Sequence, residues 1–132
     1  MRDNPAQRIL FVSNERLAGS LRRQLNARGF AVTCEQTSAE AFDQLTRSSF
    51  DIIVIDLASI TDAGEFIEQI KKIATFKITP IVVIGEWGTG RPLLALSAGA
   101  DAFESAPIDA ERLIEGIARL PRKRAAAAGN GH

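Results

Sequence analysis

The residue best placed to do chemistry in this sequence is Asp56. It closes the run 50–56 (FDIIVID), which is mostly apolar and rich in β-branched residues. Such runs are typical of strands buried on both faces of a parallel sheet, and α/β proteins place binding crevices outside the carboxyl ends of these strands. Asp56 is therefore predicted at the mouth of a crevice, where its role depends on the cations and donors that neighbouring loops supply. Without them it is only a strand-ending carboxylate capped by backbone N–H groups.

Several other kinds of active site are not expected. The single histidine, His132, is the last residue, so no serine or cysteine can pair with a histidine inside the fold. The glycine-rich segment 85–90 (GEWGTG) lacks the Lys-Ser/Thr ending of a phosphate-binding loop, and its glycines are expected in turns. Cys34 is expected to be a small packed residue, because no nearby cation in the sequence would lower its pKa. An enzyme is the least expected outcome.

Composition predicts one globular domain. Of the 132 residues, 45% are hydrophobic and 24% charged, which suits a single core over residues 1–120. Residues 121–132, with three basic residues and an Ala-rich end, are expected to form a flexible tail. The 16 basic and 16 acidic residues cancel, which argues against nucleic acid or an anionic membrane as partner. A single cysteine and the lack of a long apolar run predict a cytoplasmic protein.

Strand and helix patterns alternate along the chain. Apolar runs predict strands at 8–12, 30–35, 50–56, 80–84 and 100–103. Between them lie helical patterns: Leu17, Leu21 and Leu25 recur on one face, Thr37 to Glu40 forms a capping box, and Pro92 opens a helix that ends near Gly99. Thr61 or Asp62 is expected to cap the third helix, and Asp109 the fifth.

Five strand–helix units predict an α/β fold. Because parallel crossovers are right-handed, they are expected to form a flavodoxin-like, doubly wound three-layer sandwich with five helices and strand order 2-1-3-4-5. The loops that follow the strands at the switch point would then converge. They would bring together the following residues: Ser13, Asn14, Asp56, Gly85 and Ala106.

From Arg8 to Leu120 the sequence resembles the receiver domains of bacterial two-component response regulators. The matching segments are ILFV, SAEAFDQL, FDIIVIDL, Gly64, PIVVI and AGADAFESAPID, and their order and spacing are more specific than any one of them. The resemblance implies that Asp56 corresponds to the aspartate that is phosphorylated. It also implies an aromatic switch position at Phe103 and a cis peptide before Pro107.

Other functional positions of the family carry different residues here. Ser13 and Asn14 replace the acidic pair that binds Mg²⁺, Gly85 replaces the Thr or Ser that contacts the phosphoryl group, and Ala106 replaces the Lys. Mg²⁺ is normally held by one or two carboxylates besides water and phosphate oxygens, so Mg²⁺ binding is expected to be weak or absent. Phosphoryl transfer depends on positioning and electrostatics, so phosphorylation should be slow or absent.

Three functional hypotheses follow. The first is an atypical, pseudo-receiver type of single-domain response regulator that acts in signal transduction as a phosphorylation-independent protein-interaction module. The second is a phosphorelay receiver still phosphorylated on Asp56 by a partner kinase. The third and least expected is a small-molecule-binding protein on the same fold.

The resemblance also implies where partners bind. Histidine kinases or downstream effectors, or a second copy of the chain, would dock on the face formed by the fourth helix, fifth strand and fifth helix. With Gly85 in place of a hydroxyl, Phe103 is expected to pack statically. The residues assigned to the face are Trp87, Arg91, Leu94, Phe103, Glu104 and Arg112.

Overall fold

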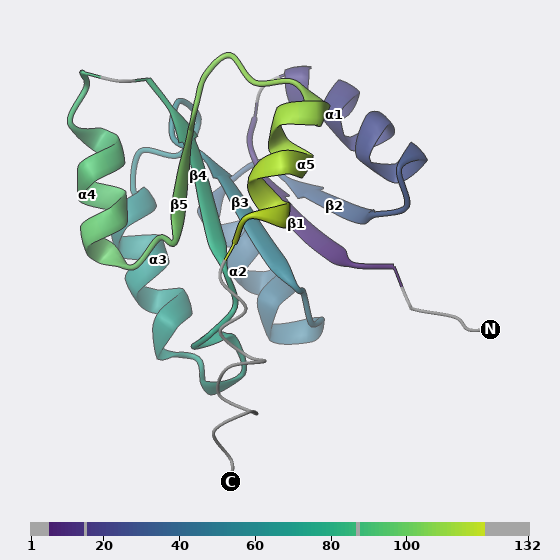
Figure 1. Cartoon of the computed structure of the whole chain (residues 1–132). Coiled ribbons are helices and arrows are strands. Elements are labelled where there is room, and N and C mark those ends of the chain that lie inside the picture. Colours follow the sequence, from purple (N-terminus) through teal and green to yellow (C-terminus); the bar gives the residue numbers. More distant parts are fainter. Residues whose placement is uncertain (1–5, 15, 87, 121–132) are drawn as a thin grey trace, which may run out of the picture.

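A computed structural model describes residues 6–14, 16–86 and 88–120 of the chain, excluding the side chains of residues 16, 17 and 74. Its centre is a five-stranded parallel sheet in the order β2-β1-β3-β4-β5, which confirms the predicted topology (Figure 1). The strands are β1 (Arg8–Val12), β2 (Ala31–Glu35), β3 (Ile52–Asp56), β4 (Ile81–Gly85) and β5 (Ala102–Ser105). The helices are α1 (Arg16–Ala27), α2 (Ser38–Arg47), α3 (Ala63–Lys72), α4 (Arg91–Ala98) and α5 (Ala110–Ala118), with a short 3₁₀ turn at Ala74–Phe76.

Alternate residues of the central strands feed two separate cores. In β3, Ile53 and Ile55 pack with side chains of α2, α3 and α4, whereas Ile52 and Val54 pack with those of α1 and α5. Both sets are buried, so β3 has no water-facing side until it reaches Asp56. The apolar run noted in the sequence is therefore explained by burial on both faces.

Most helix ends follow the predicted local chemistry. Thr37 caps α2 by accepting a hydrogen bond from the backbone N–H of Glu40, and Asp109 caps α5 by accepting one from the backbone N–H of Arg112. Asp62 holds the N-cap position of α3 but makes no capping bond, because its carboxylate accepts a hydrogen bond from Ser38 of α2. None of the described helices has the length and hydrophobicity needed to cross a membrane.

The fifth strand was placed two residues too early by the sequence pattern. The backbone N–H of Ala100 donates to the carbonyl of Ala95 and so belongs to the end of α4. Asp101 then joins the turn to β4, since its backbone N–H donates to the carbonyl of Ile81 and its carboxylate accepts from the N–H of Ile81. Pairing of β5 with β4 begins only at Ala102.

Candidate functional site

Asp56 is half-buried at the carboxyl end of β3, where hydrogen-bond donors surround its carboxylate. Ser13, from the loop after β1, donates its hydroxyl to Oδ2 at 2.8 Å. Ser59, three residues after Asp56, donates its hydroxyl to the same oxygen at 3.0 Å, and the backbone N–H of Ala58 donates to Oδ1 at 3.1 Å. Each carboxylate oxygen accepts about two hydrogen bonds. Oδ2 is therefore saturated, and Oδ1 retains capacity for one more donor.

The two positions of the missing acidic pair have different roles. Ser13 is buried, with 4% of its surface exposed, and its hydroxyl also lies 3.4 Å from that of Ser59. Asn14 is exposed, and its backbone N–H donates to the Ser59 hydroxyl at 3.1 Å. Ser59 thus links the loop after β1 to Asp56. The sequence analysis did not find this role, although a serine three residues after a strand-ending aspartate is a usual donor in a tight turn.

Gly85 lies at the end of β4 against Leu57. A Cβ atom added at Gly85 would lie 2.9 Å from Cδ1 of Leu57, a buried side chain that occupies the space a larger residue would need. The position predicted to have lost a hydroxyl is therefore filled by a neighbouring apolar group. Leu57 was also missed by the sequence analysis.

Ala106 and Pro107 form the edge of the crevice after β5. The Ala106–Pro107 peptide is cis, and the backbone N–H of Ala106 donates to the carbonyl of Gly85 at 2.7 Å. This bond joins the loops after β4 and β5, as the topology predicted. With a methyl group at position 106, this loop supplies no ammonium to Asp56.

The charged residues of the described crevice are acidic. No lysine or arginine that the structure describes forms an ion pair with Asp56 or with Glu86, which follows β4. Among the described residues, no group of three or more His, Cys, Asp or Glu side chains could hold a metal ion. A metal held here would have at most two carboxylates, one of which already accepts three hydrogen bonds.

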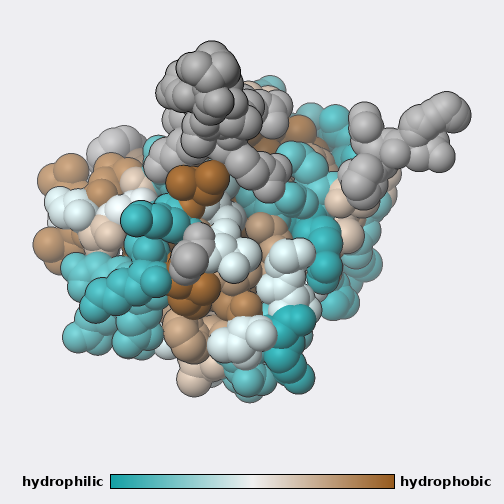
Figure 2. All heavy atoms as spheres, turned by 90° about the horizontal axis from the view of Figure 1, so that it is seen from below, coloured by the Kyte–Doolittle hydropathy of each residue, from teal (hydrophilic) through white to brown (hydrophobic). Residues whose placement is uncertain are grey.

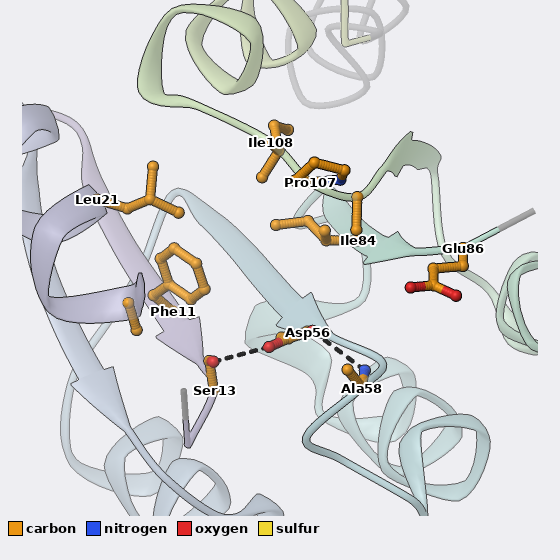
Figure 3. Close-up of a pocket in the computed structure, with 11 residues that line it drawn as sticks. Phe11, Ser13, Leu21, Asp56, Ala58, Ile84, Glu86, Pro107 and Ile108 are labelled. Carbon is orange, nitrogen blue, oxygen red and sulfur yellow. Dashed lines mark hydrogen bonds between the residues drawn. The ribbon is translucent and has the colours of Figure 1, made fainter. Parts of the chain in front are cut away.

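A cavity of about 250 Å³ opens beside Asp56. Figure 3 shows Phe11, Leu21, Ile84 and Ile108 around this space, with Asp56 and Ser13 at its polar end. The apolar side chains belong to the core between the sheet and helices α1 and α5. The crevice is therefore a small apolar pocket with a carboxylate at one end.

Arg91 lies in a different place from the one expected. It was assigned to a partner-binding face, but its guanidinium is partly buried and donates to the backbone carbonyls of Leu57 and Ile60. The second of these bonds is 2.7 Å long. Arg91 therefore ties the first turn of α4 to the loop that follows Asp56.

The remaining residues of the predicted face are arranged as follows. Phe103 is half-buried and packs against the core that contains α2, α3 and α4. Leu94 is 70% exposed. Glu104 lies 3.9 Å from Arg112 and 3.6 Å from Arg119, oxygen to nitrogen, which is ion-pair distance. Trp87 lies outside the described residues.

The sequence did not reveal how apolar the exposed side of α4 is. Leu93 is 66% exposed, and Leu96 is 37% exposed. In Figure 2 hydrophobic surface gathers at the left edge, on the side of the molecule where Figure 1 places α4. Together with Leu94, these side chains make the solvent-exposed side of α4 apolar.

Cys34 lies on the edge strand β2 and is half-buried. Burial raises the pKa of its thiol, and this effect outweighs the opposing influence of the Arg22 guanidinium. A raised pKa disfavours the reactive thiolate, which agrees with the prediction of a packed residue.

Known response regulators resemble this chain in fold and in sequence. No family model matches the sequence. In solved structures, the chain superposes on the chemotaxis response regulator CheY4 of Vibrio cholerae with a TM-score of 0.79, at 20% identity, covering 86% of this chain and 98% of that one. The chain has the fold of a response regulator receiver domain. The signal receiver domain of a histidine kinase from Syntrophus aciditrophicus gives a TM-score of 0.77 at 22% identity, covering 86% and 89% of the two chains.

Sequence comparison finds response regulators as well. The chain is 30% identical over 119 residues to the response regulator MprA of Mycobacterium sp. (strain KMS), covering 88% of this chain and 51% of that protein. It is 27% identical over 115 residues to the probable transcriptional regulator ycf29 of Porphyra purpurea, covering 85% and 55%. The chain thus spans about half the length of the curated relatives it matches. The predicted resemblance to receiver domains and the flavodoxin-like fold are confirmed.

Proposed function

We propose that this receiver domain acts in signal transduction mainly as a protein-interaction module that does not depend on phosphorylation. The observation that carries the proposal is the environment of Asp56. Its carboxylate accepts hydrogen bonds from two serine hydroxyls and a backbone N–H, and forms no ion pair with a described cation. Hydroxyl groups satisfy Asp56 as a structural carboxylate, but they bring no positive charge for a phosphoryl group.

The electrostatic cost of this arrangement is large. A phosphoryl group adds about −1.5 to −2 charges at neutral pH. An ammonium at about 4 Å from a unit negative charge is worth on the order of 4 kcal/mol at an effective dielectric near 20. Ala106 provides no such ammonium, and Ser13 and Asn14 provide no carboxylate pair for Mg²⁺. The same missing interactions would destabilise the transition state for phosphoryl transfer.

The proposed partners are other signalling proteins, either a histidine kinase or a downstream effector, in the cytoplasm. The proposed docking surface comprises α4, β5 and α5, and it would also serve a homodimer. The exposed Leu93 and Leu94 of α4 support this choice, because neighbouring exposed apolar side chains often mark protein–protein contact sites. Balanced net charge gives no support to nucleic acid as a partner.

Phosphorylation of the free chain tests the proposal. The chain is incubated with acetyl phosphate and Mg²⁺, and intact mass spectrometry follows the addition of one phosphoryl group, with Asp56→Asn as the control. We expect no addition that depends on Asp56. Rapid addition that is lost in Asp56→Asn would overturn the proposal.

The second candidate is a phosphorelay receiver that a partner kinase phosphorylates on Asp56. One observation favours it: the N–H of Ala58 is the only donor among the described residues that is within hydrogen-bond distance of Oδ1 of Asp56, and Asp56 lines a cavity. In that case a cognate kinase would supply the cations missing from this chain. Transfer from a phosphorylated kinase to the chain, absent with acetyl phosphate, would support this candidate.

A further inference from the structure

The cavity beside Asp56 has apolar walls and a charged end. Its walls come from the core side chains of Phe11, Leu21, Ile84 and Ile108, all at most 5% exposed. The pocket is open on one side, so water can reach these apolar walls, and covering apolar surface is favourable. A ligand with an apolar group would cover this surface.

The polar end of the cavity is negatively charged. Asp56 and Glu86 are its charged lining residues, and neither forms an ion pair with a described lysine or arginine. Oδ1 of Asp56 can accept one further hydrogen bond. Ala106 lines the same cavity with a methyl group, so it leaves room beside Asp56 without neutralising it. Charge complementarity therefore favours a ligand with a positively charged hydrogen-bond donor.

We infer that this cavity binds a small organic ammonium ion, a primary amine that carries an apolar group. The ammonium would donate to Oδ1 of Asp56 and lie within the field of Glu86, while the apolar group would contact Phe11, Leu21 and Ile108. An anion would meet two carboxylates that form no ion pair with a described lysine or arginine. A bare divalent ion would leave the apolar walls unfilled and would compete with Ser13 and Ser59 for Oδ2.

A volume of about 250 Å³ limits the size of the ligand. Pockets for drug-sized molecules begin at roughly 300 Å³. The apolar group is therefore limited to one small ring or a short branched chain.

The test is an amide NMR titration of the full chain with benzylammonium. Benzyl alcohol provides the same ring without charge, benzoate provides the opposite charge, and MgCl₂ alone provides a cation without a ring. We expect saturable shifts at residues 11–13, 56–59, 106 and 108 with benzylammonium, and binding weaker by about tenfold or more with each of the others. Equal binding of benzyl alcohol, or no saturable shift with benzylammonium, would overturn the inference.

Two variants locate the site. Asp56→Asn keeps the side-chain shape, removes the charge and should weaken benzylammonium binding by about tenfold. Ala106→Lys places an ammonium in the chain itself and should abolish binding, whereas Thr46→Lys, on the exposed end of α2, should not change it. Unchanged affinity in a folded Asp56→Asn chain would contradict the inference. If Asp56→Asn is unfolded, Glu86→Gln at an exposed position provides the same comparison.

This inference is independent of the proposed interaction function. The titration uses the free chain with neither a phosphoryl donor nor a protein partner. Amine binding would therefore be detected whether or not Asp56 can be phosphorylated.

Discussion

Two regions of the molecule differ in whether their carboxylate lies near a described cation. In the crevice, Asp56 accepts hydrogen bonds from Ser13 and Ser59 and has no described cation as partner. On the face formed by α4, β5 and α5, Glu104 lies within ion-pair distance of two arginines, and exposed leucines stand on α4.

This comparison shows that the residues that stabilise the fold are different from those that surround the Asp56 carboxylate. The fold depends on apolar strands and capped helices, so it forms with the uncharged residues Ser13, Asn14 and Ala106 around Asp56. Positively charged side chains lie on the surface proposed for binding. Changes in either region should therefore have distinct consequences.

The largest effect is expected from Gly116→Val in α5. A Cβ atom at Gly116 would overlap Oε2 of Glu104 and lie 3.0 Å from its carboxyl carbon, so this carboxylate must shift and its contacts with Arg112 and Arg119 change. We expect a loss of about 2 kcal/mol in the free energy of unfolding, measured by urea denaturation. Gly64→Val in α3 is the control, since nothing lies within 4 Å of that position. Equal losses in both variants would show that Glu104 does not fill the space beside α5.

Gly85→Thr tests the crevice in the same way. The new Cβ atom would lie 2.9 Å from Cδ1 of Leu57, and we expect a loss of about 1–2 kcal/mol in the free energy of unfolding. Combining it with Leu57→Ala should recover about 1 kcal/mol relative to the sum of the single changes. Strict additivity would mean that Leu57 does not exclude a larger residue.

Some of these features could be predicted from the sequence, and others could not. The buried pattern of β3 and the caps Thr37 and Asp109 are local signals, so strand order and most element ends followed from them. The filling of Gly85 by Leu57 and the reach of Arg91 depend on side-chain direction across the fold. Nothing in residue spacing encodes such long-range packing.

The start of β5 was missed for a related reason. Apolar residues from Ala100 onward fit a strand, but hydrogen bonds to Ala95 and Ile81 assign the first two residues to the turn. Ser59 could have been found, since its turn with Asp56 is local. The hydrogen bond from Ser38 to Asp62 could not, because Ser38 lies at the start of another helix.

Ser13→Ala and Ser59→Ala should each have an intermediate effect. Each removes one hydroxyl donor to Oδ2 of Asp56, and we expect losses of about 1 kcal/mol in the free energy of unfolding. The double variant should lose more than the sum, because the remaining hydroxyl can no longer compensate. Unchanged stability in all three would show that these hydroxyls do not hold the carboxylate.

The smallest effect on stability is expected from Leu94→Ser. Because this side chain is 70% exposed, the free energy of unfolding should change by less than about 0.5 kcal/mol. Self-association or partner binding, measured by analytical ultracentrifugation, should nevertheless weaken. Ile78→Ser, at an exposed residue outside α4, is the matched control and should leave association intact. Equal effects of the two changes would remove α4 from the proposed interface.

The central claim is that the Asp56 crevice does not operate a phosphorylation switch. Its most direct test is an amide NMR spectrum of the labelled chain with and without Mg²⁺ and beryllofluoride, a mimic of the phosphoryl group. We predict no saturable shift at Asp56, Gly85 or Phe103. A saturable shift that spreads from Asp56 through Gly85 to Phe103 would contradict the claim, and would mean that one carboxylate and its neighbouring backbone groups suffice for the switch.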